Sequence, residues 1–431
     1  VIGGLFTAAV LTLIVLPILF KVFDSKEFKR SKLKKGKKHL TVILLLLASS
    51  FGFAQNTNMS REAVIAKALE NNKGIKAAAL QVNKMQENIK SSFTFEKTNV
   101  YYSYDQNNLA LNNLPLKVFG VQQRFLFPTV YGVQKKANTS EFEKEKADYE
   151  LQKNKLSLQV AKTYEQIVYW QHQERLYSYL DSLYQNFSKA SDRRFELGET
   201  NYLEKITAQS KYRQIKTKLT QINFEKKAQY ESLQALVQSD EKISILEKEL
   251  VPIPTLDTTS NKAIHTAYLE SISKMYKSQI SLQKQHWLPD LNLEYFQGRN
   301  NGLSQSLYGF QVGIAVPILF SGNVSKTKVA QLESQSWEEQ KQNQEQKMTQ
   351  FIRQQQNEIA KYQESINYYN ATGKKLSEEI IKVANSSYKN GEIDFFQYIQ
   401  SLENAVAIKI EYVEAVLQFN SNQLELHYLN F

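Results

Sequence analysis

The chain lacks cysteine altogether and contains few prolines. None of its 431 residues is Cys and seven are Pro, so disulfides, Cys-ligated zinc and a thiol nucleophile are excluded. No proline lies between Pro128 and Pro252 or after Pro317. Because proline breaks the interior of a helix, these two stretches leave room for very long helices.

A charge excess is also absent from most of the chain. The formal net charge is +11, but residues 21–38 carry nine Lys or Arg against Asp24 and Glu27 and so account for +7 of it. Only about +4 is left for all other residues. The basic balance is therefore local, and without a recognisable base-reading module it argues against nucleic-acid binding.

Motifs for catalysis and metal binding are missing too. The histidines form no pair at i and i+4 and have no carboxylate at ligand spacing; they are His39, His172, His265, His286 and His427. A helical metal site requires such spacing. The sequence has no P-loop, dinucleotide fingerprint or nucleophile elbow. We therefore expect no enzyme activity, no catalytic or metal-ligating residue and no cofactor.

The first part of the chain is apolar and then basic. Residues 1–20 carry no charge, which is long enough for a membrane helix (1–23) whose basic linker (24–39) marks the cytoplasmic side. A buried helix of a soluble protein is the alternative. The chain opens on Val1 and has no Met before Met59. We expect it to be the tail of a longer polypeptide.

A second, shorter apolar run occupies residues 40–54. It follows a positive segment and ends in Gly52-Phe53-Ala54 before Gln55, the pattern of a secretory signal with small residues near the cleavage point. Either signal peptidase cuts between Ala54 and Gln55, or the segment stays as a short anchor. In both cases the residues that follow are expected to cross the membrane.

Residues 60–431 predict a unit of helix, two strands and long helical hairpin that occurs twice. A helix from Ser60 to about Lys90 precedes alternating residues near 100–104 and 119–127, and helices of roughly 55–60 and 40 residues should meet at Gly198. The second copy offers a helix at 262–287, strands near 290–295 and 308–316, and a turn at Gly391. We expect copy one at 60–238, a joint at 239–261 and copy two at 262–431.

The two copies share a register. Apolar residues spaced 3,4,3,4 follow one helix of copy two, and the same pattern lies 193 residues earlier. The seam comprises Ile359, Tyr362, Ile366, Tyr369, Gly373, Leu376, Ile380 and Val383. Such spacing lets one helix pack along another for many turns. A duplicated helical hairpin is therefore the predicted scaffold.

Four strands of nine to eleven residues match the length of tilted membrane-spanning β-strands. They cannot close alone, and open edges in lipid would leave backbone groups unpaired. Three chains would supply 12 strands, so a homotrimer is expected if the strands contact membrane lipid. The soluble alternative is a pair of small sheets capping a coiled coil.

Residues 60–431 resemble the TolC-like outer-membrane efflux duct family. The resemblance is carried by the order of elements, by Arg194-Phe195-Glu196-Leu197-Gly198 and Tyr388-Lys389-Asn390-Gly391 at the turns, and by Val316-Pro317-Ile318-Leu319-Phe320-Ser321-Gly322. It implies a mainly α fold with a small β part: a trimeric α-barrel across the periplasm and a 12-stranded transmembrane β-barrel in the outer membrane of a Gram-negative bacterium.

The resemblance also implies roles for the hairpin turns. Family members dock a periplasmic adaptor (membrane fusion protein) through them; the docking residues here would be Leu197, Gly198, Glu199, Asn390, Gly391 and Glu392. A left-handed turn glycine is the plain alternative. An acidic residue often lies six positions after the glycine, near the closed aperture. The candidate gate residues are Arg194, Glu204, Tyr388, Asp394, Gln397 and Gln400.

Residues 1–17 are similar to the last membrane helix of resistance-nodulation-division pumps. The similarity is carried by Val1-Ile2-Gly3-Gly4-Leu5, Leu11-Thr12-Leu13 and Val15-Leu16-Pro17. The last two segments look more like the heavy-metal branch than the drug-exporting branch. This implies an inner-membrane pump as partner and heavy-metal cations as candidate substrates of a passive export duct. The alternatives are a periplasmic adaptor or coiled-coil spacer without a pore, and a cytoplasmic coiled-coil scaffold.

Overall fold

The computed structural model describes residues 58–109, 113–257, 259–300, 302 and 304–428. They belong to one compact unit, Asn56–Phe431. The predicted membrane helix, basic linker, signal-like segment and cleavage site at Ala54 and Gln55 all lie outside the described residues. Within the described part, no helix combines the length and apolarity needed to cross a membrane.

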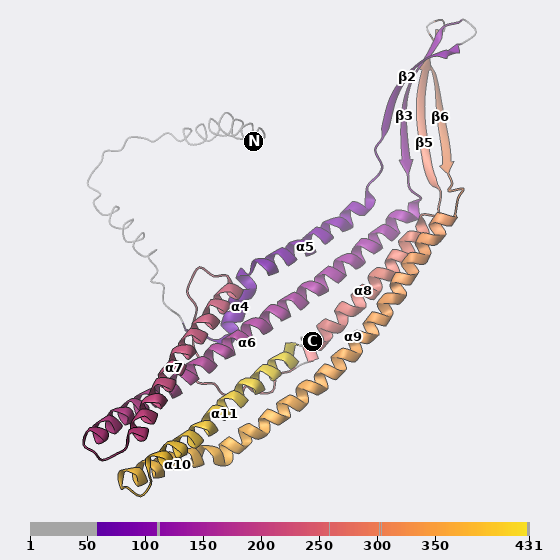
Figure 1. The fold of residues 1–431 in the computed structure, drawn as a ribbon. Helices are drawn as coiled ribbons and strands as arrows, with labels where there is room; N and C mark the ends of the chain where they lie inside the picture. The colour runs from indigo at the N-terminus through magenta and orange to yellow at the C-terminus, as the bar shows by residue number, and fades with distance from the viewer. Residues whose placement is uncertain (1–57, 110–112, 258, 301, 303, 429–431) are drawn as a thin grey trace, which may run out of the picture. The chain divides into compact units, whose positions relative to one another are not determined.

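The first copy has the predicted order of helix, two strands and hairpin (Figure 1). Ser60 caps the first helix, because its side chain accepts a hydrogen bond from the backbone of Ala63 at 3.3 Å. Pro128 occupies the first turn of the longest helix, where its missing N–H costs nothing. The elements are β1 (Asn58–Met59), α4 (Arg61–Asn71), α5 (Lys73–Lys90), the short η2 (Ser91–Phe93), β2 (Asn99–Leu109), β3 (Pro115–Phe125), α6 (Pro128–Glu196) and α7 (Tyr202–Val237).

The second copy repeats this order after a joint that holds β4 (Ser244–Ile245). Strand β4 pairs in parallel with β1, so the joint is hydrogen-bonded to the first strand of copy one. The elements that follow are α8 (Thr259–Gln285), β5 (Asp290–Arg299), β6 (Leu307–Ala315), α9 (Ser321–Tyr368), the π-helix η3 (Tyr369–Gly373), α10 (Lys374–Lys389) and α11 (Phe395–Tyr428).

The four long strands form one antiparallel sheet in the order β2-β3-β5-β6. The register pairs Tyr102 with Phe119, Val121 with Tyr295, and Tyr295 with Phe310. The sheet lies at one end of α5, α6, α8 and α9. The two hairpin turns lie at the far ends of α6 and α10, well beyond the ends of α5 and α8 (Figure 1). Strands β2 and β6 are the two edges of this sheet.

The predicted single helix from Ser60 to Lys90 is wrong. Asn72, with φ −60° and ψ 121°, leaves the helical conformation. Its side chain accepts hydrogen bonds from the backbone of Gly74 (2.8 Å) and Ile75 (3.3 Å) and so caps a second helix, α5. A polar cap inside an otherwise periodic segment therefore divides it into α4 and α5.

The long helix of copy two contains a π turn that the 3,4 spacing did not predict. Tyr369–Gly373 form this turn, and it carries more residues per turn than the seam assumes. Beyond it the buried residues are Ser377 and Ala384, whereas the predicted Leu376 and Val383 are 40% and 55% exposed. The seam is therefore correct at Ile366 and one residue out of register after Gly373.

The two larger clusters of buried apolar residues hold the helices together. One lies midway along the helices and joins α4, α6, α7, the joint, α9 and α11 around Tyr164, Ile366 and Val416. The other lies near the turns and joins α6, α7, α10 and α11 around Phe187, Tyr398 and Leu402. The two hairpins are thus packed against each other through apolar contacts at both levels.

Candidate functional site

The two hairpin turns have the same backbone conformation. Gly198 and Gly391 both have φ +73°, in the left-handed region that favours glycine. In the first turn Leu197 N–H donates to Arg193 O (3.1 Å) and in the second Asn390 N–H donates to Ser386 O (3.0 Å). The remaining turn bonds also correspond at the 193-residue offset, which explains why glycine is needed at both positions.

The helices that leave the turns also begin in the same way. Asn201 is the N-cap of α7, and its side chain accepts from Glu204 N–H at 2.9 Å. Asp394 stands at the equivalent place, and its side chain accepts from Gln397 N–H at 2.8 Å. Gln397 returns the contact by accepting from Asp394 N–H at 3.0 Å. The reciprocal pair is a capping box.

The structure brings three of the predicted gate residues into one cluster. Arg194 donates to Glu204 Oε1 at 3.2 Å, within hairpin one, and to the Tyr388 hydroxyl at 3.1 Å, across to hairpin two. Glu204 is also hydrogen-bonded to the Thr200 hydroxyl. The Glu204 side chain is 13% exposed and that of Arg194 is 40% exposed. The cluster is therefore a partly solvated polar link between the two hairpins.

Aromatic packing holds Tyr388 in this cluster. Its ring stacks on Tyr398 with centroids 4.6 Å apart, and Phe187 packs beside both rings. Burial raises the pKa of the Tyr388 hydroxyl, and the Arg194 guanidinium opposes that shift. Burial also raises the pKa of Tyr398 to about 12. Both hydroxyls therefore stay protonated and neutral near pH 7.

The other predicted gate residues lie apart from this cluster. Asp394 and Gln397 are occupied with each other in the capping box. Gln400 donates to Asn404 Oδ1 at 3.1 Å along the exposed side of α11. Sequence reasoning missed Thr200 and Tyr398. A signal for Tyr398 was present in the sequence. Tyr388 and Tyr398 lie ten residues apart on either side of the turn at Gly391, so the two helices of the hairpin bring their side chains together.

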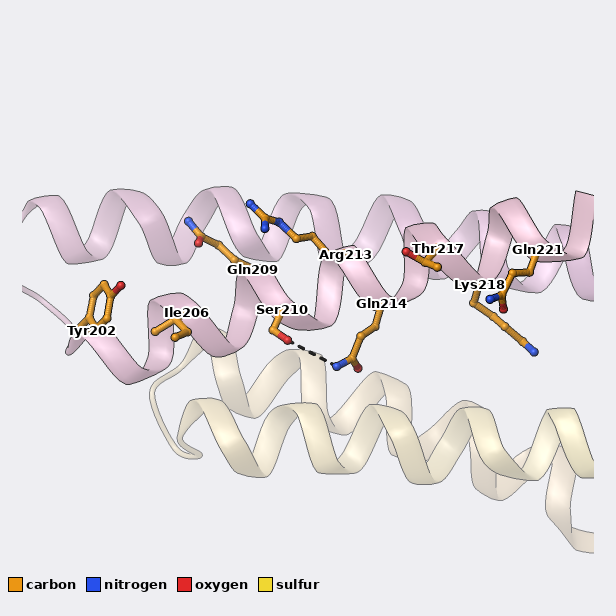
Figure 2. Close-up of a pocket in the computed structure, with 9 residues that line it drawn as sticks. All are labelled: Tyr202, Ile206, Gln209, Ser210, Arg213, Gln214, Thr217, Lys218 and Gln221. Carbon is orange, nitrogen blue, oxygen red and sulfur yellow. Dashed lines mark hydrogen bonds between the residues drawn. The ribbon is translucent and has the colours of Figure 1, made fainter.

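Beside the first turn, α7 presents an exposed groove of about 720 Å³. Tyr202 and Ile206 form its apolar end, and their side chains are 63% and 43% exposed. Gln214 donates to the Ser210 hydroxyl at 3.5 Å in its middle (Figure 2). The other lining residues are Gln209, Arg213, Thr217, Lys218 and Gln221. The groove thus exposes both apolar and polar side chains of α7, from Tyr202 beside the turn to Gln221.

One face of the sheet is mainly apolar, and the other is mainly small or polar. Alternate residues of each strand point to the same side, and the register places the apolar sets together: Val100, Tyr102, Tyr104, Phe119, Val121, Leu291, Leu293, Tyr295, Tyr308, Phe310, Val312 and Ile314. Tyr308, Phe310 and Val312 are each more than 70% exposed. On the other face Arg124 forms an ion pair with Asp290, and Tyr101 donates a hydrogen bond to Glu294.

Comparison with known proteins gives structural matches only. No protein-family model and no curated protein matches the sequence. Among solved structures, the Campylobacter jejuni CmeC outer membrane channel superposes with a TM-score of 0.71 at 14% identity, over 94% of each chain. The outer-membrane channel OprN gives 0.73 at 11% identity, over 94% of this chain and 97% of that one.

The chain has the fold of these outer-membrane channels. CusC, which forms a transmembrane channel, adds a TM-score of 0.71 at 14% identity, over 86% of this chain and 92% of its own. Identities this low establish the fold alone. The predicted mainly α fold with a small strand part is therefore confirmed, and the soluble arrangement with two separate sheets is wrong because all four strands pair in a single sheet.

Proposed function

We propose that this protein is the outer-membrane channel of a tripartite efflux system and acts as a passive export duct. The observation that carries the proposal is the four-stranded sheet, which is mainly apolar on one face, mainly small or polar on the other and open at both edges. An apolar face suits lipid, and a polar face suits a water-filled lumen. The likeness to outer-membrane channels over most of the chain supports this assignment.

Open edges in lipid require further copies of the chain. Unpaired N–H and C=O groups on β2 and β6 would cost several kcal/mol each in a bilayer, so the edges must pair. Three copies would close a 12-stranded barrel by joining β6 of one chain to β2 of the next. The exposed Leu376 and Val383 would then pack against the neighbouring protomer and complete the wall of the α-barrel.

The cluster at the turns would serve as the closed-state latch of this duct. Arg194 links Glu204 of hairpin one to Tyr388 of hairpin two, so the second hairpin cannot swing away until those bonds break. Asp394, Gln397 and Gln400 would line the aperture of the duct near this latch. Partly exposed pairs of this kind are worth under about 1 kcal/mol, weak enough for an adaptor to break.

The turns would also carry the docking surface for the adaptor. Leu197 is 65% exposed next to Gly198, and the groove of α7 begins five residues later at Tyr202 (Figure 2). The adaptor would bridge to a resistance-nodulation-division pump, whose terminal helix is expected in residues 1–23, with heavy-metal cations as candidate substrates. Cleavage between Ala54 and Gln55 would release the duct into the periplasm.

Planar-bilayer recording combined with membrane fractionation tests the function. The chain expressed in a Gram-negative host should fractionate with the outer membrane as a trimer and give single-channel conductance after purification. Glu204→Ala plus Asp394→Ala should raise the closed-state conductance if these residues belong to the gate. A monomer confined to the inner membrane, without conductance, would instead favour the pore-free adaptor.

A further inference from the structure

A groove between α6 and α8 is lined by lysines from both helices. Lys135 and Lys136 come from α6, Lys274 and Lys277 come from α8, and the groove encloses about 530 Å³. All four side chains are exposed. Its other lining residues are Thr139, Ser140, Ser278 and Ser281. Within the described residues, no carboxylate forms an ion pair with these four ammonium groups.

The groove belongs to a wider zone that contains lysines and no acidic residue. Lysine is the only charged residue type in residues 128–140 of α6, 271–285 of α8 and 321–332 of α9. The first acidic residues beyond it are Glu141, Glu270 and Glu333. At about 1.5 Å per residue, the zone reaches roughly 20 Å from the sheet on all three helices. The adjacent α5 differs, because there Lys90 pairs with Glu87.

A chain of aromatic contacts places the groove on the same side as the apolar sheet face. Phe125, on that face, packs edge-on against Phe95 at 5.5 Å, and Phe95 packs against Tyr131 at 5.6 Å. Tyr131 stacks with Phe93, and the Lys135 ammonium lies 6.0 Å from the Phe93 ring. Tyr131 and Lys135 are one helical turn apart and share a face of α6.

This placement sets the groove at headgroup depth. Aromatic residues gather at the boundary between hydrocarbon and water in membrane proteins, and the Phe125–Tyr131 contacts form such a cluster at the base of the sheet. Lys135 follows it by one turn of α6, about 6 Å. The polar headgroup layer begins at that boundary and extends over a similar distance.

We propose that the groove binds the headgroup of an anionic phospholipid of the phosphatidylglycerol type, in the leaflet next to the helices. The inference rests on the proposed function, which supplies the membrane around the sheet. Lysine ammonium groups are compact donors that bind phosphate as point charges. A phosphate seated among four unpaired lysines would neutralise a surface that otherwise repels itself.

The hydroxyl groups of the groove select the remainder of the headgroup. Thr139 and Ser140 donate to the carbonyls of Lys135 (2.7 Å) and Lys136 (3.0 Å) on their own helix. Ser278 and Ser281 do the same on α8. Their protons are therefore used, and the oxygens face the groove as acceptors. Glycerol hydroxyls can donate to such acceptors, whereas the quaternary ammonium of phosphatidylcholine has no N–H to donate.

Titration calorimetry on the full chain, purified in a non-ionic detergent, tests the site. The probes are dihexanoylphosphatidylglycerol, dihexanoylphosphatidylcholine and sodium phosphate. We expect the first to bind at least about tenfold more tightly than the other two. The variant K135Q/K136Q/K274Q/K277Q should lose at least about tenfold in that affinity, and raised salt should weaken the wild type similarly.

A charge-matched control removes exposed lysines nearer the turns, in the variant K227Q/K374Q/K375Q/K382Q, and should bind as the wild type does. If the groove variant does not fold, the pair Lys135→Gln and Lys277→Gln replaces it. Unchanged affinity in the groove variant would overturn the site. Sodium phosphate that binds as tightly as the phospholipid would overturn the lipid occupant.

Conductance in phosphatidylcholine bilayers separates this inference from the proposed function. Wild type and groove variant should both conduct there, because the groove is outside the predicted lumen. Conductance combined with unchanged phosphatidylglycerol affinity in the groove variant would overturn the lipid site alone. Loss of conductance in the wild type itself would contradict the duct, and with it the membrane setting of the groove.

Discussion

The ends of the two hairpins share a backbone and differ in side-chain chemistry. Both turns have a glycine at φ +73° and the same hydrogen bonds. In the first, Arg194 lies 3.9 Å from Glu199, and Lys205 lies 4.9 Å from the centre of the Phe195 ring. The equivalent places in the second turn hold a Ser387–Glu392 hydrogen bond of 2.8 Å and the Tyr388–Tyr398 stack.

The comparison of the two turns shows which features a duplicated hairpin must keep. The turn fixes a glycine and an N-cap acceptor, because backbone groups at helix ends need partners whatever the neighbours are. The residues around them are free to differ. Hairpin one has Arg194 where hairpin two has Ser387, and hairpin two has Tyr388 where hairpin one has Phe195. Arg194 of the first therefore has an acceptor in the Tyr388 hydroxyl of the second. Identical halves would lack this complementary contact.

Removing the aromatic contact between the hairpins should have the largest effect. Phe187 is 8% exposed and stacks on Phe395 at 4.7 Å, so Phe187→Ala should cost about 3 kcal/mol of stability. Ile380 occupies the equivalent place in hairpin two and is only partly buried; Ile380→Ala should cost about 1 kcal/mol. Thermal unfolding followed by circular dichroism measures both. Equal losses would mean that the asymmetry between the hairpins is not energetic.

The middle of the hairpins is joined by a polar network whose loss should rank next. Arg61 pairs with the buried Glu165 of α6 at 3.0 Å, and Asn420 of α11 donates to the same carboxylate at 2.8 Å. Arg61→Ala leaves that carboxylate without its cation. Breaking a fully buried pair costs about 3–5 kcal/mol. We expect a loss of stability at or below about 3 kcal/mol near pH 7, because both side chains retain some exposure.

The pH dependence of this variant has a definite sign. Burial raises the pKa of Glu165, against the opposing influence of Asn420 and Arg61, and losing Arg61 raises it further. Above the unfolded pKa, about 4.3, the native state then holds the extra proton, so stability falls as pH rises. The deficit of Arg61→Ala should therefore be smaller at pH 5 than at pH 7. A deficit that grows on acidification would contradict this account.

The two turn glycines should show equal and smaller effects. Gly198→Ala and Gly391→Ala each place a Cβ at φ +73°, which costs about 1–2 kcal/mol. As a control, Gly132→Ala in the body of α6, where an added Cβ meets nothing within 4 Å, should raise stability by about 0.5 kcal/mol. Unfolding temperatures decide the matter, and unequal losses at the two turns would show that one of them is strained or supported differently.

The polar link should have the smallest effect on stability and a clear effect on gating. Arg194→Met removes its bonds to Glu204 and Tyr388 and should change stability by under about 1 kcal/mol, while raising the closed-state conductance. Ser387→Ala, at the equivalent place in hairpin two, loses only the bond to Glu392 and should leave conductance unchanged. Equal closed-state conductance in the two variants would contradict the proposed role of Arg194 as a latch.

Periodicity and turn residues predicted much of this fold, and side-chain competition explains the rest. Strand alternation located β6 because each residue has one of two faces to occupy. It could not reveal the break at Asn72, where a side-chain cap replaces the helix bond, or the π turn at Tyr369–Gly373. At the site, the 193-residue offset located both turns. Which gate residues meet depended on side-chain reach across hairpins, and that brought Arg194 to Tyr388 and left Gln400 with Asn404.

Disulfide trapping between sheet edges tests whether β6 of one chain pairs with β2 of the next, and the chain has no native cysteine to interfere. Tyr102→Cys on β2 would be combined in turn with Tyr308→Cys, Phe310→Cys and Val312→Cys on β6. If three chains close the barrel, mild oxidation of at least one combination should give covalent dimers and trimers on a denaturing gel, while each single variant gives none. Monomers from every combination, in protein that still folds, would contradict a barrel closed by three chains.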